Sequence, residues 1–200
     1  MIKVSRALLY CTKGKMNLRK SIKDKDYYLD NGSEFNIIPK EDYSLNGKIA
    51  IECDFEVEEI TNCGTSFMIM KYDDLQESYK YTNKIAKGSC LDYTDLRRYL
   101  GIKNGYAIHI KNLNIFDKPK ELSEYHKIEE VGDMLFTELL TKSPKNMMRV
   151  SINHWNYFTY NTEDIRIMIP VSPEEMCRIA NKEQDILIRK RVLKEILNND

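Results

Sequence analysis

Residues 88–125 of this 200-residue chain carry the order of elements that decides its fold: GSCLDYTDLRRYLGIKNGYAIHIKNLNIFDKPKELSEY. We predict a turn, a short helix over 93–100, a strand over 106–116 and a second turn. Asp92 can cap the helix, because its carboxylate can accept hydrogen bonds from the first free N–H groups. Gly101 favours the helix end, since glycine adopts left-handed backbone most easily. The strand is rich in aromatic and branched residues, and Pro119 ends it because proline cannot donate to a sheet ladder.

A second long strand is predicted over residues 47–60, where apolar and polar side chains alternate. Such alternation places one face of a strand on a core and the other in water. The side chains expected in the core are Ile49, Ile51, Cys53, Phe55 and Val57. Residues 3–12 are predicted to form a strand that is buried on both faces, and residues 13–43 a long loop. Residues 73–85 are predicted to form a helix with acidic residues in its first turn.

The C-terminal part has an organisation of its own. Residues 128–141 carry apolar side chains at helical spacing despite Gly132, and residues 147–152 and 164–169 predict two strands. Ser172-Pro173-Glu174-Glu175 is a strong helix start, because a capping residue and a proline precede acids in the first turn. We expect this helix or helix pair to run to about Leu197, and either to dock on its own domain or to face a partner.

Composition excludes several classes of protein. The formal net charge is zero, which disfavours a generic nucleic-acid binder. The charged side chains of residues 3–25 are nevertheless basic except for Asp24, and they could form one basic face or an ordinary solvated surface. No apolar run approaches eighteen residues, and no secretory signal opens the chain, so we expect no membrane segment. Five cysteines without paired spacing indicate reduced thiols and a cytoplasmic protein.

Several of these segments together resemble the ASCH family, a branch of the PUA-like β-barrel superfamily, in the form often carried by phages and prophages. The matching motifs are Tyr10-Cys11-Thr12-Lys13, Leu45-Asn46-Gly47-Lys48-Ile49, Ser89-Cys90-Leu91, Gly105-Tyr106-Ala107 with His109, and the tail from Asp117 to Tyr125. Residues 141–148 look like a degraded closing strand of the family. The resemblance spans roughly residues 2–152.

The resemblance implies an α+β fold: a small PUA/ASCH-like β-barrel with flanking helices, followed by a C-terminal β-hairpin plus helix extension. We therefore expect a barrel domain over residues 1–152 and the extension over residues 153–200. Two departures from the family stand out. The usual N-terminal segment, which supplies basic and polar residues to the ligand cleft, has no counterpart in this sequence, and the extension is an addition.

The family implies a cleft that binds RNA or a nucleotide-like ligand, and non-catalytic binding is the leading hypothesis. One alternative is a phage inhibitor of a host defence factor, acting by binding that protein or by sequestering a nucleotide. A further alternative is hydrolysis of acetylated cytidine, as in some small relatives that use a lysine, a threonine and a glutamate. That lysine belongs to the missing segment and the glutamate has no match near Lys87 and Gly88, so catalysis is the weaker hypothesis.

The resemblance assigns ligand-binding roles to six residues: Tyr10, Thr12, Lys13, Ser89, Cys90 and His109. Lysine provides a point charge for phosphate, and amides at a helix start can bind an anion. Cys90 would need His109 as a base to act as a nucleophile. Each of these residues can also be interpreted as purely structural: as the end of a strand, a turn residue, a buried thiol, or a histidine whose hydrogen bonds are made within the fold.

An aromatic segment after the family-like region provides candidate partner contacts. Trp155, Tyr157 and Phe158 could stack on unpaired bases, anchor a protein partner, or pack within a hairpin. The three histidines and the cysteines lack close pairs of the usual zinc spacing, and no glycine-rich phosphate loop is present, so we expect neither a metal nor a cofactor.

Overall fold

The computed structural model describes residues 4–12, 45, 47–62, 67–68, 75–131, 134–156 and 161–196. The predicted loop over 13–43 and the predicted site residues Lys13, Tyr157 and Phe158 lie outside these residues. The described elements, in chain order, are β1 (Arg6–Cys11), β2 (Ile49–Asn62), β3 (Phe67–Met68), α2 (Leu75–Gly88), α3 (Tyr93–Leu100), β4 (Gly105–Lys120), β5 (His126–Val131), β6 (Met134–Leu139), β7 (Met148–Ser151), β8 (Ile165–Val171), α4 (Pro173–Ala180) and β9 (Ile186–Arg189), with short 3₁₀ helices at Leu122–Glu124, Thr162–Asp164 and Lys194–Ile196.

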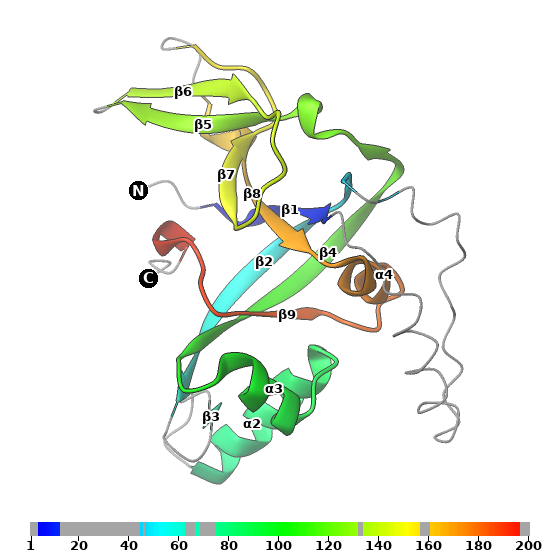
Figure 1. Cartoon of the computed structure of the whole chain (residues 1–200), viewed down its shortest axis with the longest axis vertical. Helices are drawn as coiled ribbons and strands as arrows, with labels where there is room; N and C mark the ends of the chain where they lie inside the picture. The colour runs from blue at the N-terminus through cyan, green and yellow to red at the C-terminus, as the bar shows by residue number, and fades with distance from the viewer. Residues whose placement is uncertain are drawn as a thin grey trace.

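Most of the strands form one sheet in the order β6-β5-β7-β8-β1-β2-β4-β9, and β3 pairs with the end of β2 (Figure 1). β1 and β8 run parallel, whereas the other neighbours along this order are antiparallel. β6 and β9 stand at opposite ends of the order among the described strands, so the sheet is open and a closed barrel is not confirmed. With its helices the chain is an α+β protein.

β2 and β4 form the central ladder, from Ile49 opposite Lys120 to Ile60 opposite Gly105. The predicted alternation in β2 is confirmed over its middle, where Ile51, Cys53 and Phe55 are buried and Glu56 is exposed. It fails at both ends, because Ala50 on the opposite face is buried and Val57 is only half-buried. β4 extends to Lys120, past its predicted end at residue 116. The register shifts between Ile49 and Ile51, and such an irregularity lets a ladder accommodate residues that cannot pair regularly, including Pro119.

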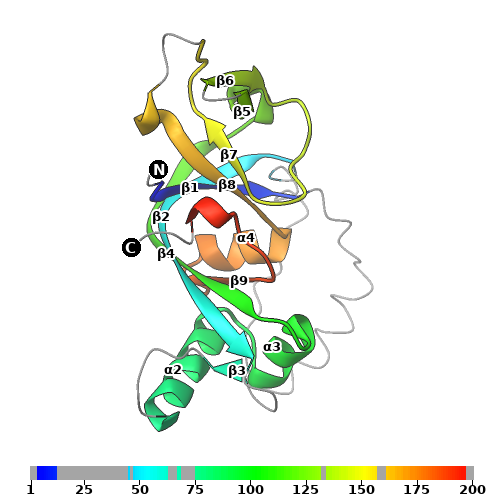
Figure 2. The ribbon, with the colours of Figure 1, turned by 90° about the vertical axis from the view of Figure 1, so that its left-hand side faces the viewer.

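The α2–α3 region forms one end of the molecule, against the far end of β2 and β4 (Figures 1 and 2). The predicted cap of α3 is confirmed, because the Asp95 amide donates to the Asp92 carboxylate at 2.7 Å and Gly101 ends the helix with φ 69°. A core of its own lies beneath the two helices, made by Ile60, Ile85, Ala86, Leu96, Leu100, Ala107, Ile186 and Ile188.

The largest core lies between the middle of the sheet and α4. Leu9, Ile167 and Ile169 from β1 and β8 pack there with Met176 and Ile179 of α4, and all five are fully buried. Figure 2 shows α4 between β8 and β9. The parallel pairing of β1 with β8 therefore brings residues 165–180 onto the N-terminal strand.

The predicted helix over residues 128–141 is wrong: β5 and β6 form an antiparallel hairpin, with Ile128 opposite Thr137. Only Ile128 and Thr137 of this pair of strands are buried, and Val131, Met134 and Leu139 stay exposed. Over so few residues, apolar side chains three and four positions apart occur in strands as well as in helices. The spacing alone therefore could not distinguish a helix from a β-hairpin.

The predicted continuation of the last helix to Leu197 is also wrong, because α4 ends at Ala180 and residues 186–189 form β9. Lys182 turns the chain with φ 61°. β9 then inserts between two cores: Leu187 packs in the main core, whereas Ile186 and Ile188 pack under α2 and α3. A strand covered on both faces needs consecutive apolar residues, and Ile186-Leu187-Ile188 supply them.

Strands from both sides of the predicted boundary at 152/153 lie in one sheet. The predicted C-terminal hairpin is present as β7 paired with β8, from Met148 opposite Met168 to Ser151 opposite Ile165. β8 in turn pairs with β1, and β9 pairs with β4. Among the helices that the structure describes, none has the length and apolarity needed to cross a bilayer.

Candidate functional site

A pocket of about 610 Å³ lies beside the start of α4. Its walls come from segments far apart in the sequence: the residue after β1, the turn after α2, α3, residues 145–147, the β8–α4 junction, and β9 with the residues that follow it. Ligand sites in proteins typically have volumes of about 300–1,000 Å³. The pocket is therefore large enough for a small organic ligand.

Two of the predicted ligand-binding residues, Thr12 and Ser89, line this pocket. The Thr12 amide donates to the Val171 carbonyl at 2.9 Å, which holds the end of β1 against the β8–α4 junction. The Ser89 hydroxyl donates to the Ala86 carbonyl at 2.7 Å, at the end of α2. The structure thus brings together two segments that the family resemblance had selected separately.

Tyr10, another residue that was predicted to bind the ligand, lies in the protein interior. Its side chain is fully buried and its hydroxyl donates to Ser143 Oγ at 2.8 Å. It packs with Met168 and Val150 in a third small core. Tyr10 does not line the pocket, because β1 is covered on both faces at this point and its side chains alternate between two cores.

Cys90 sits at the rim of the turn after α2 with φ 55°. Its thiol donates to the Glu183 carbonyl at 3.4 Å, which connects this turn to the one after α4. Partial burial raises the pKa of the thiol, with nearby Arg178 acting in the opposite direction. A thiol that keeps its proton and shares it with a carbonyl is poorly prepared for nucleophilic attack.

His109 forms a polar cluster outside the pocket lining. Its Nε2 lies 2.8 Å from Glu58 Oε2, and the Tyr81 hydroxyl donates to the same carboxylate at 2.9 Å. The ladder places His109 opposite Ile186, on the face of the sheet that α2 covers. His109 and Cys90 thus form their side-chain hydrogen bonds with other partners, Glu58 and the Glu183 carbonyl, and not with each other.

Trp155 supports the packing interpretation of the aromatic segment. Its side chain is fully buried, and Nε1 donates to Asp164 Oδ2 at 3.1 Å. Its amide donates to Thr137 Oγ1 at 2.7 Å, so the ring connects the β5–β6 hairpin to the segment before β8. A buried indole whose N–H is satisfied acts as a core residue.

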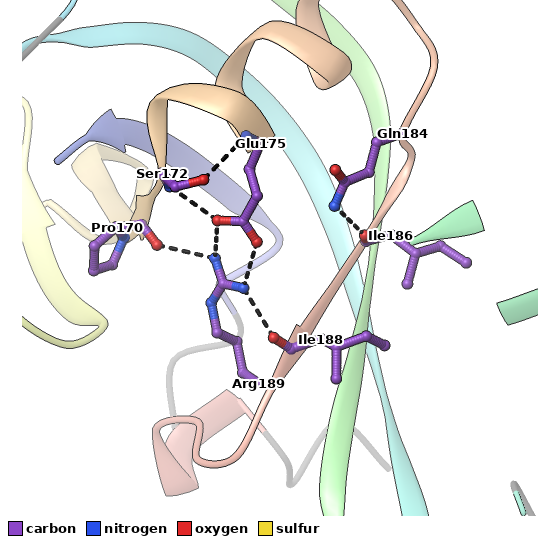
Figure 3. Close-up of polar contacts among 7 residues, drawn as sticks. All are labelled: Pro170, Ser172, Glu175, Gln184, Ile186, Ile188 and Arg189. Atoms are coloured by element: carbon purple, nitrogen blue, oxygen red, sulfur yellow. Dashed lines mark hydrogen bonds and ion pairs between the residues drawn. The ribbon is translucent and has the colours of Figure 1, made fainter. Parts of the chain in front are cut away.

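The strongest polar contact in the pocket wall was not predicted. Arg189 of β9 donates to both carboxylate oxygens of Glu175 in α4, at 2.9 and 3.2 Å (Figure 3). The same guanidinium donates to the carbonyls of Pro170 and Ile188. Glu175 also closes the capping box of α4, accepting from the Ser172 amide at 2.9 Å. One carboxylate therefore holds the helix start and the edge strand together.

Three further basic side chains line the pocket, and they pair with no acid within the described residues: Lys145, Arg178 and Arg191. Glu175 is the acid among the described lining residues, and Arg189 already neutralises it. Unpaired cations around a cleft create a positive potential that attracts anions. The wall also carries apolar area from Leu91, Ile188 and Val192 and the partly exposed ring of Tyr99.

The sequence contained weak signals for these residues. Ser172 and Glu175 form the predicted helix start, and Arg189 and Arg191 flank an apolar run, but nothing local indicates that they meet. The described residues contain no group of three or more histidines, cysteines and acids able to hold a metal ion. No family model, curated protein or solved structure matches this chain.

Proposed function

We propose that this chain binds RNA or a nucleotide-like ligand in the pocket beside α4, without catalysing its conversion. The observation that carries the proposal is the excess of basic charge: Lys145, Arg178 and Arg191 line one cavity and lack acidic partners among the described residues. Arginine and lysine are the residues that bind phosphate, arginine through its fork and lysine as a point charge.

The other walls of the pocket suit the rest of a nucleotide. Tyr99 is 40% exposed and provides an aromatic surface, while Leu91, Ile188 and Val192 provide apolar area. Bases stack on such surfaces with little dependence on sequence. Thr12 and Ser89, which the ASCH resemblance selects, belong to the same cavity, and this agreement supports an ASCH/PUA-like origin of the fold.

Catalysis is less well supported than binding. The Cys90 thiol donates to a backbone carbonyl and its pKa is raised, whereas His109 is engaged by Glu58 away from the pocket. A nucleophile and its base must lie within hydrogen-bonding distance of each other. The arrangement of these residues therefore favours a binding protein.

The test is to titrate the protein with a short 5′-phosphorylated RNA and with mononucleotides, and to measure binding by calorimetry or fluorescence anisotropy. Replacing Arg178 and Arg191 together by alanine is expected to weaken binding at least about tenfold, or about 1.4 kcal/mol. If both contact phosphate, the slope of log K against log salt should become flatter by about 1.4 for single-stranded RNA.

The control replaces two exposed lysines outside the pocket, Lys103 and Lys118, by alanine. This variant loses the same formal charge, so it should change the affinity only through the weak long-range electrostatic field of the whole protein. Equal losses in the two double variants would show that net charge, and not the pocket, governs binding. Absence of binding by the parent protein would refute the proposed function.

A second candidate function, inhibition of a host factor by protein binding, has one observation in its favour. Val131, Met134 and Leu139 are about half exposed on the β5–β6 hairpin, and β6 is an edge strand. Exposed edges with apolar side chains can pair with another protein. A Met134→Glu and Leu139→Glu variant should then lose a specific host protein in affinity capture while retaining nucleotide binding. Equal recovery of that protein by both forms would contradict this candidate.

A further inference from the structure

One polar side chain in the pocket wall has an incomplete set of hydrogen bonds. Gln184 lies between α4 and β9, is 3% exposed, and lines the pocket. Its Nε2 donates to the Ile186 carbonyl at 2.9 Å, whereas its Oε1 is buried without a hydrogen-bond partner among the described residues. Buried acceptors in native proteins are nearly always paired, so this oxygen requires an explanation.

The orientation of the amide follows from its surroundings. Reversing the group would place its oxygen against the Ile186 carbonyl oxygen, and two acceptors at this distance repel each other. Figure 3 shows the amide nitrogen turned to Ile186 and the oxygen on the side of Glu175. The hydrogen bond to the Ile186 carbonyl of β9 therefore fixes the orientation of the amide and leaves Oε1 as the free acceptor.

The donors drawn beside Gln184 in Figure 3 are already used: both terminal nitrogens of Arg189 donate to Glu175 and to backbone carbonyls, and the Ser172 amide donates to Glu175. The unpaired basic side chains of the pocket do not reach Gln184 Oε1, which has no hydrogen-bond partner among the described residues. A donor for this oxygen therefore has to come from a molecule that enters the pocket. The oxygen is covered from water, but the adjoining wall includes residues 191–193, which belong to no helix or strand. Leu193 is tied to the short helix that follows, because its carbonyl accepts from the Ile196 amide at 3.1 Å, whereas Arg191 and Val192 form no backbone hydrogen bond with the described residues and can shift without breaking one.

We propose that Gln184 reads an exocyclic amino group, so that the pocket prefers a nucleotide with an adenine- or cytosine-type base. This inference rests on the proposed function of the pocket. An amino group can donate to Gln184 Oε1, whereas the oxo group that replaces it in hypoxanthine or uracil has no proton to give. A site built to accept a hydrogen bond discriminates strongly against an analogue that cannot donate one.

The experiment compares AMP with IMP, which differ in the group at C6 and in the proton that hypoxanthine carries on N1, and includes ribose 5-phosphate as a ligand without a base. The parent protein should bind AMP at least about tenfold more tightly than IMP, since each lost hydrogen bond to a buried acceptor has an effect of this order. Gln184→Met, which keeps the length of the side chain without its amide, should remove the preference while the variant still binds ribose 5-phosphate.

The sequence offers a matched control, because the chain contains two glutamines, Gln76 and Gln184. Gln76 is exposed on α2 and does not line the pocket, so Gln76→Met should retain the preference. A second measurement needs no variant: with glutamine labelled with ¹³C at the side-chain carbonyl, AMP should shift the Gln184 signal, while IMP should not.

The outcomes separate the two proposals. If neither nucleotide nor ribose 5-phosphate binds the parent protein, the proposed function fails and this inference fails with it. If AMP and IMP bind equally, or if Gln184→Met retains the preference, the pocket binds nucleotides but Gln184 does not select them. An unfolded Gln184→Met variant leaves the labelling experiment to decide, and an unshifted Gln184 signal at saturating AMP would overturn the inference.

Discussion

The α2–α3 region and the segment of residues 165–193 differ in how their structure is specified. α3 begins and ends at signals within its own sequence, the Asp92 cap and Gly101, and both act as predicted. β9 has no such signal and exists because two cores meet across it. The pocket lies mainly along this second segment, so the part of the molecule that depends most on long-range contacts also carries the candidate function.

The largest expected effect tests the two-sided burial of β9. Leu187→Asp should destabilise the protein by about 4 kcal/mol or more, because an unpaired carboxylate would be buried in the main core. The control is Ile102→Asp in the α2–α3 region, at a side chain that is 88% exposed, with an expected change within about 0.5 kcal/mol. Chemical denaturation measures both. Similar stabilities for the two variants would mean that β9 is not part of the core.

Local patterns predicted the elements that carry their own signals. The alternation of β2, the strand at 106–116, the cap of α3 and the helix start at Ser172 are all present. The errors fall where tertiary packing decides between structures with similar spacing. β5 pairs with β7 as well as with β6, and β9 pairs with β4, and neither β7 nor β4 can be identified as the neighbour from a short stretch of sequence.

The site was predictable only in part, for the same reason. Thr12 and Ser89 were selected by family resemblance and do line the pocket, but Arg189 and Glu175 become partners only after α4 ends and the chain returns as β9. Gln184 carried no signal in the sequence at all. Its importance comes from an unpaired oxygen, which is a property of the folded structure.

The next prediction compares an ion pair from each region through double-mutant cycles. Glu175→Gln with Arg189→Met should show a coupling energy of about 1–2 kcal/mol, because this bidentate pair is mostly buried. Asp95→Asn with Arg98→Met in α3 should show about 0.3–0.5 kcal/mol, since those side chains are 46% and 76% exposed. Equal couplings would remove the proposed role of Glu175 in fixing β9 to α4.

A smaller effect is expected for the cap of α3. Asp92→Ala should cost about 1 kcal/mol, because the Asp95 amide would lose its acceptor. Asp92→Asn should restore most of this stability, as asparagine caps almost equally well. Since the cap acts within its own turn, hydrogen exchange should increase mainly in α3 and leave β9 unchanged. Faster exchange throughout β9 would show that the two regions are energetically coupled.

A pair of histidines joins β5 to the segment after β7, away from both regions. His126 of β5 lies opposite Ser151 of β7, and its ring is 5.3 Å from the ring of His154, measured between centroids. His154 Nδ1 lies 3.2 Å from Thr137 Oγ1, whereas His126 Nδ1 is buried without a partner among the described residues. Burial and, to a lesser degree, His154 lower the pKa of His126 below its ordinary value of 6.5.

The last prediction concerns the dependence of stability on pH. Because the native pKa of His126 is lowered, the unfolded chain takes up this proton first as the pH falls. The contribution of neutral His126 is therefore complete above about pH 6.5, the ordinary value, and declines as the pH falls through it. His126→Phe should flatten the change in unfolding free energy between pH 7.5 and pH 5.5. A parent protein whose stability is unchanged over this range would contradict the prediction. A slope that survives the substitution would assign the proton uptake to other groups.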